Sequence, residues 1–208
     1  MAVAAVDLHG GTAVEPLPEQ RAAPRFTALI RAAKLVCGQG EFVCVVRDVS
    51  VGGVRLRCFH TVPHDTAMAL ELQNGDMLDI VPVRQDGCDA SFRFPRHVSI
   101  ERMIGESELY PRRLLRLNIA IPLTLRTPAG CVPAVTRNIS QQGCRLDCGV
   151  PLALAQPVII ESRHLPGIRA KVRWRHDGGC GLVFDDTFSL KDFAIHAARL
   201  QCPALMQP

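Results

Sequence analysis

The sequence holds two pairs of arginines, and in each pair three residues separate the members. Arg21 and Arg25 form the first pair, and Arg112 and Arg116 form the second, with Arg113 as an extra cation beside it. A guanidinium group keeps its positive charge and presents several N–H donors in a planar fork. That fork matches phosphate oxygens and the O6/N7 edge of guanine. We expect each pair to act as a short clamp for an anion.

A polar signature follows each clamp at nearly the same distance. Asp48 lies 23 residues after Arg25, and Asn138 lies 22 residues after Arg116. On a strand, an Asx oxygen can accept from the N1/N2 edge of guanine, and a serine two positions later shares its face and can donate to phosphate. A glycine three positions further takes a positive φ or lets a flat base approach the backbone. The pattern predicts an anionic guanine nucleotide as ligand. The two signatures are Asp48, Ser50 and Gly53, and Asn138, Ser140 and Gly143.

The same signature also has a local interpretation. Asx and serine side chains often bond nearby backbone amides in a β-turn, and glycine often supplies the left-handed position of such a turn. The residue types alone leave both interpretations open, but two copies that each follow an arginine pair favour the ligand.

The two copies belong to a longer internal repeat. The segment "RDVSVGGVRLRC" begins at Arg47, and "RNISQQGCRLDC" begins at Arg137, 90 positions later. Glu71 and Glu161 keep the same offset, and so do the ends of "VRQDGCDASFRF" and "WRHDGGCGLVF". A repeat of this length predicts a duplicated domain.

Each unit has the pattern of short strands. The segments "EFVCVVRDVS" and "CVPAVTRNIS" are rich in β-branched residues, and the DG and DGG sequences indicate hairpin turns. Strands at this spacing indicate a small barrel. In "SLKDFAIHAARLQ", apolar residues at helical spacing follow Ser189 as an N-cap and predict a closing helix, and "PRHVSIERMIG" is its weaker counterpart. We expect a flexible tail at 1–20, a first barrel at 21–104, a linker at 105–111, a second barrel with its helix at 112–202 and a tail at 203–208.

Composition narrows the class of protein. Hydrophobic residues make up 48% and charged residues 21%, close to the globular average. The sequence has no long apolar run and no signal-like start, which predicts a cytoplasmic protein without membrane insertion. Residues 105–208 hold 13 basic and 8 acidic residues, and residues 1–104 hold 11 and 12, so neither half has the basic stripe typical of nucleic-acid binders. Nine cysteines without a CxxC pair argue against a disulfide or zinc framework.

The arginine pairs and polar signatures resemble the RxxxR and [D/N]xSxxG motifs of the PilZ domain family. The resemblance covers nearly all of residues 21–200, as two copies in tandem. Members of that family fold as a six-stranded antiparallel barrel with a C-terminal helix and are bacterial receptors for cyclic di-GMP. The resemblance therefore implies a mainly β chain with two such barrels, each followed by a helix, and cyclic di-GMP as ligand without a further cofactor.

The resemblance also implies a function. Nucleotide binding would change the shape of the protein and regulate motility, exopolysaccharide synthesis or surface attachment through a protein partner. The alternative is a docking adaptor that has lost the ligand, which the uncharged Asn138 and the altered last hairpin of the first unit favour. The residues implied in binding are Arg21, Arg25, Asp48, Ser50, Gly53, Arg112, Arg113, Arg116, Asn138, Ser140 and Gly143.

The remaining histidine, cysteine and tryptophan residues are expected to serve the fold rather than a reaction. His60 and His64 lie four apart but have no third ligand nearby, so we expect a loop rather than a metal site. Cys144 and Cys148 are expected in or lining the core. Trp174 is expected in the core, with base stacking as the alternative. The sequence contains no nucleophile elbow, HExxH or Walker loop, so we expect no catalytic residue and no enzyme.

Overall fold

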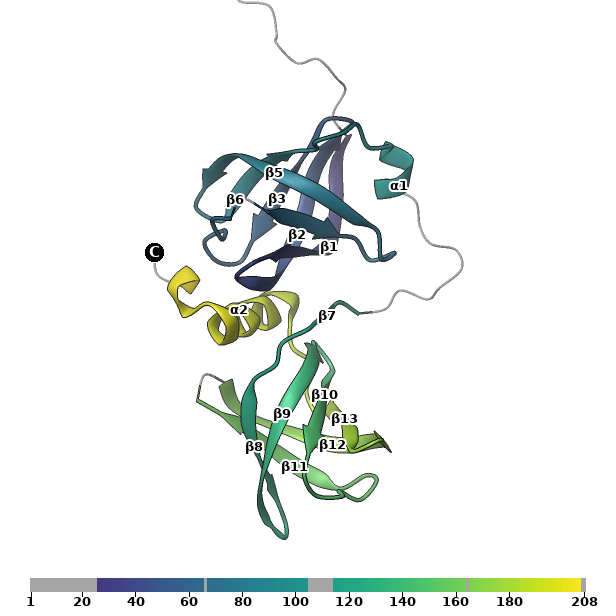
Figure 1. The fold of residues 1–208 in the computed structure, drawn as a ribbon, viewed down its shortest axis with the longest axis vertical. Coiled ribbons are helices and arrows are strands. Elements are labelled where there is room, and N and C mark those ends of the chain that lie inside the picture. The colour runs from purple at the N-terminus through teal and green to yellow at the C-terminus, as the bar shows by residue number, and fades with distance from the viewer. Residues whose placement is uncertain (1–25, 66, 105–113, 164, 207–208) are drawn as a thin grey trace, which may run out of the picture.

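The computed structural model describes residues 26–65, 67–104, 114–163 and 165–206, which form two barrels. The first barrel, drawn in purple to teal in Figure 1, closes in the strand order β1-β2-β3-β6-β5-β4. All its neighbouring strands are antiparallel. The strands are β1 (Phe26–Cys37), β2 (Gly40–Ser50), β3 (Gly53–Cys58), β4 (Met68–Glu71), β5 (Met77–Asp86) and β6 (Asp89–Arg93).

The second barrel, drawn in green, has the same strand order. Its six strands follow one another as β8-β9-β10-β13-β12-β11, and β8 pairs with β11 to close the ring. A short strand, β7, pairs with β9 beyond the end of β8, so β7 and β8 together take the place of β1. The strands are β7 (Arg116–Leu117), β8 (Pro122–Thr127), β9 (Gly130–Ser140), β10 (Gly143–Cys148), β11 (Pro157–Ser162), β12 (Leu165–His176) and β13 (Gly179–Phe184).

The two barrels also repeat the same irregularities. A β-bulge interrupts the pairing of β2 with β3 at Arg47, and the equivalent bulge lies at Arg137 between β9 and β10. A second bulge lies at Val83 in β5, and its equivalent lies at Arg173 in β12. A bulge reverses the alternation of inward and outward side chains beyond it. The structure therefore confirms the two six-stranded barrels that the sequence predicts.

Helix α2 (Leu190–Gln201) lies between the barrels and contributes to both cores (Figure 1). Ser189 caps it as expected, since its hydroxyl accepts a hydrogen bond from the backbone N–H of Asp192 at 3.1 Å. Phe193 and Ala197 are buried in the core of the second barrel, whereas Ala198 is fully buried in the core of the first. The helix thus joins the two barrels through apolar contacts on different faces.

The position of α2 explains an unusual strand. All residues from 42 to 46 of β2 are buried, although a barrel strand normally buries every second residue. One face of β2 lines the first barrel, and the other lies under α2, where Val43 joins the core of the second barrel. On β9, the equivalent residues Pro133 and Val135 are exposed.

Two segments differ in size or packing from the expectation. The helix after the first barrel, α1 (Ile100–Ile104), has only five residues. Residues 203–206, predicted as a tail, form the 3-10 helix η1 (Pro203–Met206), whose Leu205 is buried in the first barrel and accepts a hydrogen bond from Thr61 N at 3.1 Å. The predicted tail at 1–20 and linker at 105–111 lie outside the described residues. Within the described part of the chain, no helix is long and apolar enough to cross a membrane.

Candidate functional site

Four residues form a row across the outer face of the second barrel. Asn138 on β9 lies opposite Arg145 on β10, Arg145 lies opposite Gly181 on β13, and Gly181 lies opposite Trp174 on β12. We call these four residues the second row. The side chains of Asn138, Arg145 and Trp174 face away from the core, because the bulges at Arg137 and Arg173 change the alternation of β9 and β12.

Trp174 is the unexpected member of this row. The sequence favoured a core position, but the side chain is 39% exposed. The indole lies across Gly181, where a Cβ atom would overlap the ring, so a larger residue there would displace the indole. The guanidinium carbon of Arg145 lies 5.9 Å from the ring centroid, within cation–π range. The row therefore presents a partly exposed aromatic ring with a cation over it.

Ser140 and Gly143 close the hairpin between β9 and β10. They lie directly opposite each other, and the hydroxyl of Ser140 donates to the carbonyl of Gly143 at 3.1 Å. Gly143 does not have a positive φ, but a Cβ atom there would overlap the backbone carbonyl of Leu182 on β13. Ser50 and Gly53 repeat this arrangement at 3.3 Å. Close strand packing thus accounts for both glycines and a local bond for both serines, while their ligand roles remain predictions.

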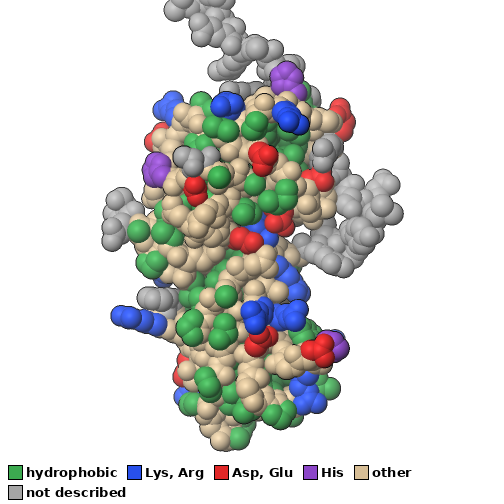
Figure 2. Space-filling model, in the orientation of Figure 1, with side chains coloured by type: hydrophobic (Ala, Val, Ile, Leu, Met, Phe, Trp, Pro, Cys, Tyr) green, Lys and Arg blue, Asp and Glu red, His purple; other side chains and the backbone are tan. Residues whose placement is uncertain are grey.

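Arg116 is the one residue of the predicted clamps that the structure describes. It lies on β7 directly opposite Ser140, and its side chain is exposed. The structure thus brings Arg116 next to the hairpin that bears Asn138. On the face shown in Figure 2, Lys and Arg side chains gather on the upper part of the second barrel, near the junction. The other predicted clamp residues, Arg21, Arg25, Arg112 and Arg113, lie outside the described residues.

The first barrel has an equivalent row with different side chains. Asp48 on β2 lies opposite Arg55 on β3, Arg55 lies opposite Ser91 on β6, and Ser91 lies opposite Arg84 on β5. We call these four residues the first row. They line a cavity of about 520 Å³ that also includes the predicted Ser50 and Gly53. A cavity of this size is sufficient for a small ligand.

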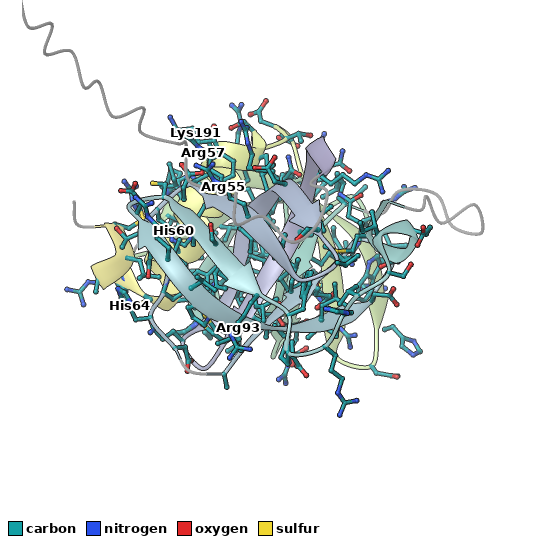
Figure 3. The ribbon with its side chains drawn as sticks, turned by 90° about the horizontal axis from the view of Figure 1, so that it is seen from above. Arg55, Arg57, His60, His64, Arg93 and Lys191 are labelled. Carbon is teal, nitrogen blue, oxygen red and sulfur yellow. The ribbon has the colours of Figure 1, made fainter. Side chains whose placement is uncertain are left out.

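Carboxylates oppose the arginines of the first row. Asp89 lies 4.0 Å from Arg55 and 3.6 Å from Arg57, and these arginines are neighbours on one side of the barrel in Figure 3. Asp86 lies 3.8 Å from Arg84, so both arginines of the row face acidic groups. In the second barrel, Asp147 pairs with Arg137 instead. Among the residues that the structure describes, Arg145 has no carboxylate partner.

The histidines and cysteines have structural positions. His60 is buried, its Nδ1 lies 2.8 Å from the carbonyl of Thr61, and burial lowers its pKa. His64 is exposed. Cys144 is buried, which raises its pKa to about 12, and Cys148 is half-buried against the same core. Within the described ranges, no group of three or more His, Cys, Asp or Glu residues could hold a metal ion.

Several solved structures are similar to the chain at low identity. The PilZ domain of CeSA from a cellulose-synthesizing bacterium is 19% identical with a TM-score of 0.32, covering 43% of this chain and 97% of its own. The Borreliella burgdorferi PlzA protein in complex with c-di-GMP is 11% identical with a TM-score of 0.34, covering 82% and 87%. YcgR from Escherichia coli in complex with c-di-GMP is 9% identical with a TM-score of 0.34, covering 81% and 82%.

The sequence itself gives a more specific comparison. No curated protein matches the chain. One family model matches, and its range of residues 109–198 contains the second barrel and most of α2 but none of the first barrel. By this match, the second barrel with its helix is the part of the chain that is similar to the PilZ domain family.

Proposed function

We propose that the chain is a cytoplasmic receptor for cyclic di-GMP and that the nucleotide binds on the outer face of the second barrel. In this proposal, Arg116, together with Arg112 and Arg113, engages the phosphates. Asn138 accepts from a guanine edge, and Trp174 stacks against a guanine ring. The protein acts as a receptor without a metal, a cofactor or a catalytic residue.

The single observation that carries this proposal is the composition of the second row. A large aromatic side chain is normally buried, but Trp174 lies outside the barrel over a glycine. Base stacking on an aromatic ring contributes about 1–3 kcal/mol, and an arginine without a carboxylate partner is available to an anion. Arg145 and Asn138 are direct neighbours of each other in the same row. The surface thus offers a stacking ring, a cation and an amide at the site that the signature predicts.

The first barrel is proposed as the weaker site. It would bind the nucleotide through Arg21, Arg25, Asp48, Ser50 and Gly53. Its row has no aromatic side chain, and its arginines already face Asp86 and Asp89. Moving an arginine from a carboxylate to a phosphate gains less than engaging an unpaired one, because the first ion pair must be broken.

The downstream effect follows the family resemblance. Engagement of the arginine clamps by the nucleotide would change the relative orientation of the barrels or uncover a surface for a protein partner. Regulation of motility, exopolysaccharide synthesis or surface attachment is the proposed output. A ligand shifts such an equilibrium only through its differential affinity for the two states.

Isothermal titration calorimetry with cyclic di-GMP tests the proposal. Arg116→Ala is expected to weaken binding by roughly tenfold to hundredfold, because a hydrogen bond to a charged group contributes about 1.5–3 kcal/mol. Arg126→Ala is the matched control, since Arg126 is an exposed arginine of the same barrel that pairs with Glu161 at 2.9 Å. This control should bind as the wild type does.

A second candidate function is a docking adaptor that does not bind the nucleotide. The observation that favours it is the first barrel, which uses the outer face of β2 to hold α2 rather than a ligand. The absence of heat with the wild-type chain at roughly tens of micromolar nucleotide would favour the adaptor. Equal binding by Arg116→Ala and the wild type would refute the proposed site.

A further inference from the structure

Glu41, the second residue of β2 in the first barrel, contacts the C-terminal helix through its backbone. The side-chain carbonyl of Gln201 on α2 accepts from Glu41 N at 2.9 Å, and the amide group of Gln201 donates to Glu41 O at 2.6 Å. A side-chain amide that satisfies both backbone groups of one residue fixes the relative position of two elements. The end of α2 is therefore held against the beginning of β2.

The carboxylate of the same residue contacts the second barrel near Arg116. Its Oε2 accepts from the backbone N–H of Asn118 at 2.7 Å, and its Oε1 accepts from the Asn118 side-chain amide at 2.8 Å. Asn118 directly follows β7, the two-residue strand that begins with Arg116. One side chain of the first barrel thus holds the segment that carries the predicted clamp of the second barrel.

A buried lysine pairs with this carboxylate. Lys34 lies 3.0 Å from Glu41 and 2.9 Å from Glu71, and its side chain is only 6% exposed. Burial by itself lowers the pKa of Lys34, but hydrogen bonds to Glu71 and Glu41 outweigh it and leave the pKa above its usual value. Carboxylate oxygens accept stronger hydrogen bonds than uncharged oxygens do, which suits the Glu41 side chain to hold Asn118.

Lys34, Glu41 and Glu71 form a charged cluster in the first barrel. The second barrel has the same strands but lacks this cluster. The pairing of β8 with β9 repeats the pairing of β1 with β2, with every residue number higher by 90. Lys34 therefore corresponds to Thr124, and Glu41 corresponds to Cys131. A barrel of this kind therefore closes without a buried lysine and its two carboxylates. The cluster is a feature of the junction rather than of the fold.

We propose that Glu41 is a positioning residue for Arg116. By anchoring Asn118, it keeps β7 paired with β9, so that Arg116 stays opposite Ser140 in the sheet before a ligand arrives. A strand of two residues has little pairing of its own, and preorganisation of a binding group reduces the entropy lost on binding. By thermodynamic reciprocity, a nucleotide held by Arg116 also strengthens the contact between the barrels. This inference rests on the proposed nucleotide site.

Three variants test the inference. Glu41→Ala removes the anchor, and Asn118→Ala removes one of its two bonds while leaving Lys34 fully paired. Glu71→Gln is the matched control, because it disturbs the same buried lysine without touching Asn118. Each variant is measured by calorimetry with cyclic di-GMP and by hydrogen exchange at the Asn118 amide without ligand.

The expected loss of nucleotide affinity differs among the three variants. Glu41→Ala weakens nucleotide binding by about tenfold or more, Asn118→Ala by roughly threefold to tenfold, and Glu71→Gln leaves binding near the wild-type value. The Asn118 amide exchanges faster in Glu41→Ala than in Glu71→Gln. Wild-type affinity in both Glu41→Ala and Asn118→Ala would overturn the inference. If Glu41→Ala does not fold, the nucleotide affinity of Asn118→Ala tests the inference, and wild-type affinity in that variant would overturn it.

The two proposals can fail separately. If the wild-type chain shows no binding, the nucleotide site is refuted, and with it the effect of Glu41 on affinity. Hydrogen exchange then decides whether Glu41 anchors β7. Faster exchange at Asn118 in Glu41→Ala upholds the anchor, and equal exchange in Glu41→Ala and the wild type refutes it.

Discussion

The two barrels present the same row of cross-strand partners, but only one position keeps the same residue. Arginine is retained on the third strand of each unit, whereas the aspartate becomes asparagine, the serine becomes glycine and an arginine becomes tryptophan. In strand order, the first row is Asp48, Arg55, Ser91 and Arg84, and the second row is Asn138, Arg145, Gly181 and Trp174.

This difference separates the features that serve the fold from those that we propose to serve a ligand. The serine and glycine of the signature have the same local contacts in both barrels, so these contacts do not distinguish the two surfaces. The row beside them differs, because Asp86 and Asp89 face the arginines of the first row, whereas an exposed indole lies beside Arg145. We infer that a shared backbone supports two surfaces that differ in their suitability for a nucleotide with anionic phosphates.

The largest expected effect concerns the shared glycines. Gly143→Ala and Gly53→Ala should each lower the free energy of unfolding by about 1–3 kcal/mol, because the new Cβ atom overlaps the carbonyl of a neighbouring strand. Urea unfolding measures the change. Gly149→Ala is the control, since it has open space around it and no positive φ. If Gly143→Ala were as stable as Gly149→Ala, the close packing of β10 on β13 would be refuted.

The next effect should appear in one barrel only. Trp174→Ala is expected to weaken cyclic di-GMP binding by about 1–3 kcal/mol, the contribution of one stacked base. Trp174→Phe should retain most of the affinity, because phenylalanine keeps an aromatic face. Arg84→Ala changes the equivalent position of the first row and should leave the affinity unchanged. Calorimetry measures all three, and an equal loss in Arg84→Ala and Trp174→Ala would remove the distinction between the rows.

The smallest effect is on stability as a function of pH. Burial lowers the pKa of His60, so below its ordinary pKa near about 6.5 the unfolded state binds more protons than the folded state. The free energy of unfolding should therefore fall as the pH falls through this region, and His60 contributes at most about 1.4 kcal/mol per pH unit to the slope. His196 on α2 has a pKa shifted in the same direction by burial and contributes as well. The equivalent of His60 in the second barrel is Val150, which does not titrate.

Urea unfolding near about pH 7.5 and about pH 5.5 checks this expectation. His60→Asn keeps a donor for the carbonyl of Thr61 and should reduce the pH dependence, leaving the part due to His196. An undiminished pH dependence in His60→Asn would show that His60 does not cause it.

The sequence was sufficient to predict the fold, because the information was repeated. Turn residues, β-branched segments and the offset of 90 positions all indicated two similar barrels, and Ser189 marked the start of the last helix correctly. The packing of α2 against the first barrel was not predicted. The fully apolar run from 42 to 46 was its signal, since a strand that buries both faces has a neighbour outside the barrel.

The candidate site was predicted in part. The signature predicted that Asp48 and Asn138 lie on strands, as they do, whereas Trp174 was expected in the core and is 39% exposed. Simple alternation from the buried Val172 places Trp174 inside, and the bulge at Arg173 reverses it. A bulge depends on pairing between distant strands, so no local pattern reveals it. The role of Glu41 depends on the junction between the barrels and was likewise inaccessible to sequence patterns.

The chain has one tryptophan, so its emission reports on the second row alone. Titration of the wild-type protein with cyclic di-GMP, followed by tryptophan fluorescence, therefore tests directly which barrel binds. We expect a saturable change in emission that follows the calorimetric binding curve and is strongly reduced in Arg116→Ala. Calorimetric binding without any change in the emission of Trp174, retained in Arg116→Ala, would contradict a nucleotide site on the second barrel.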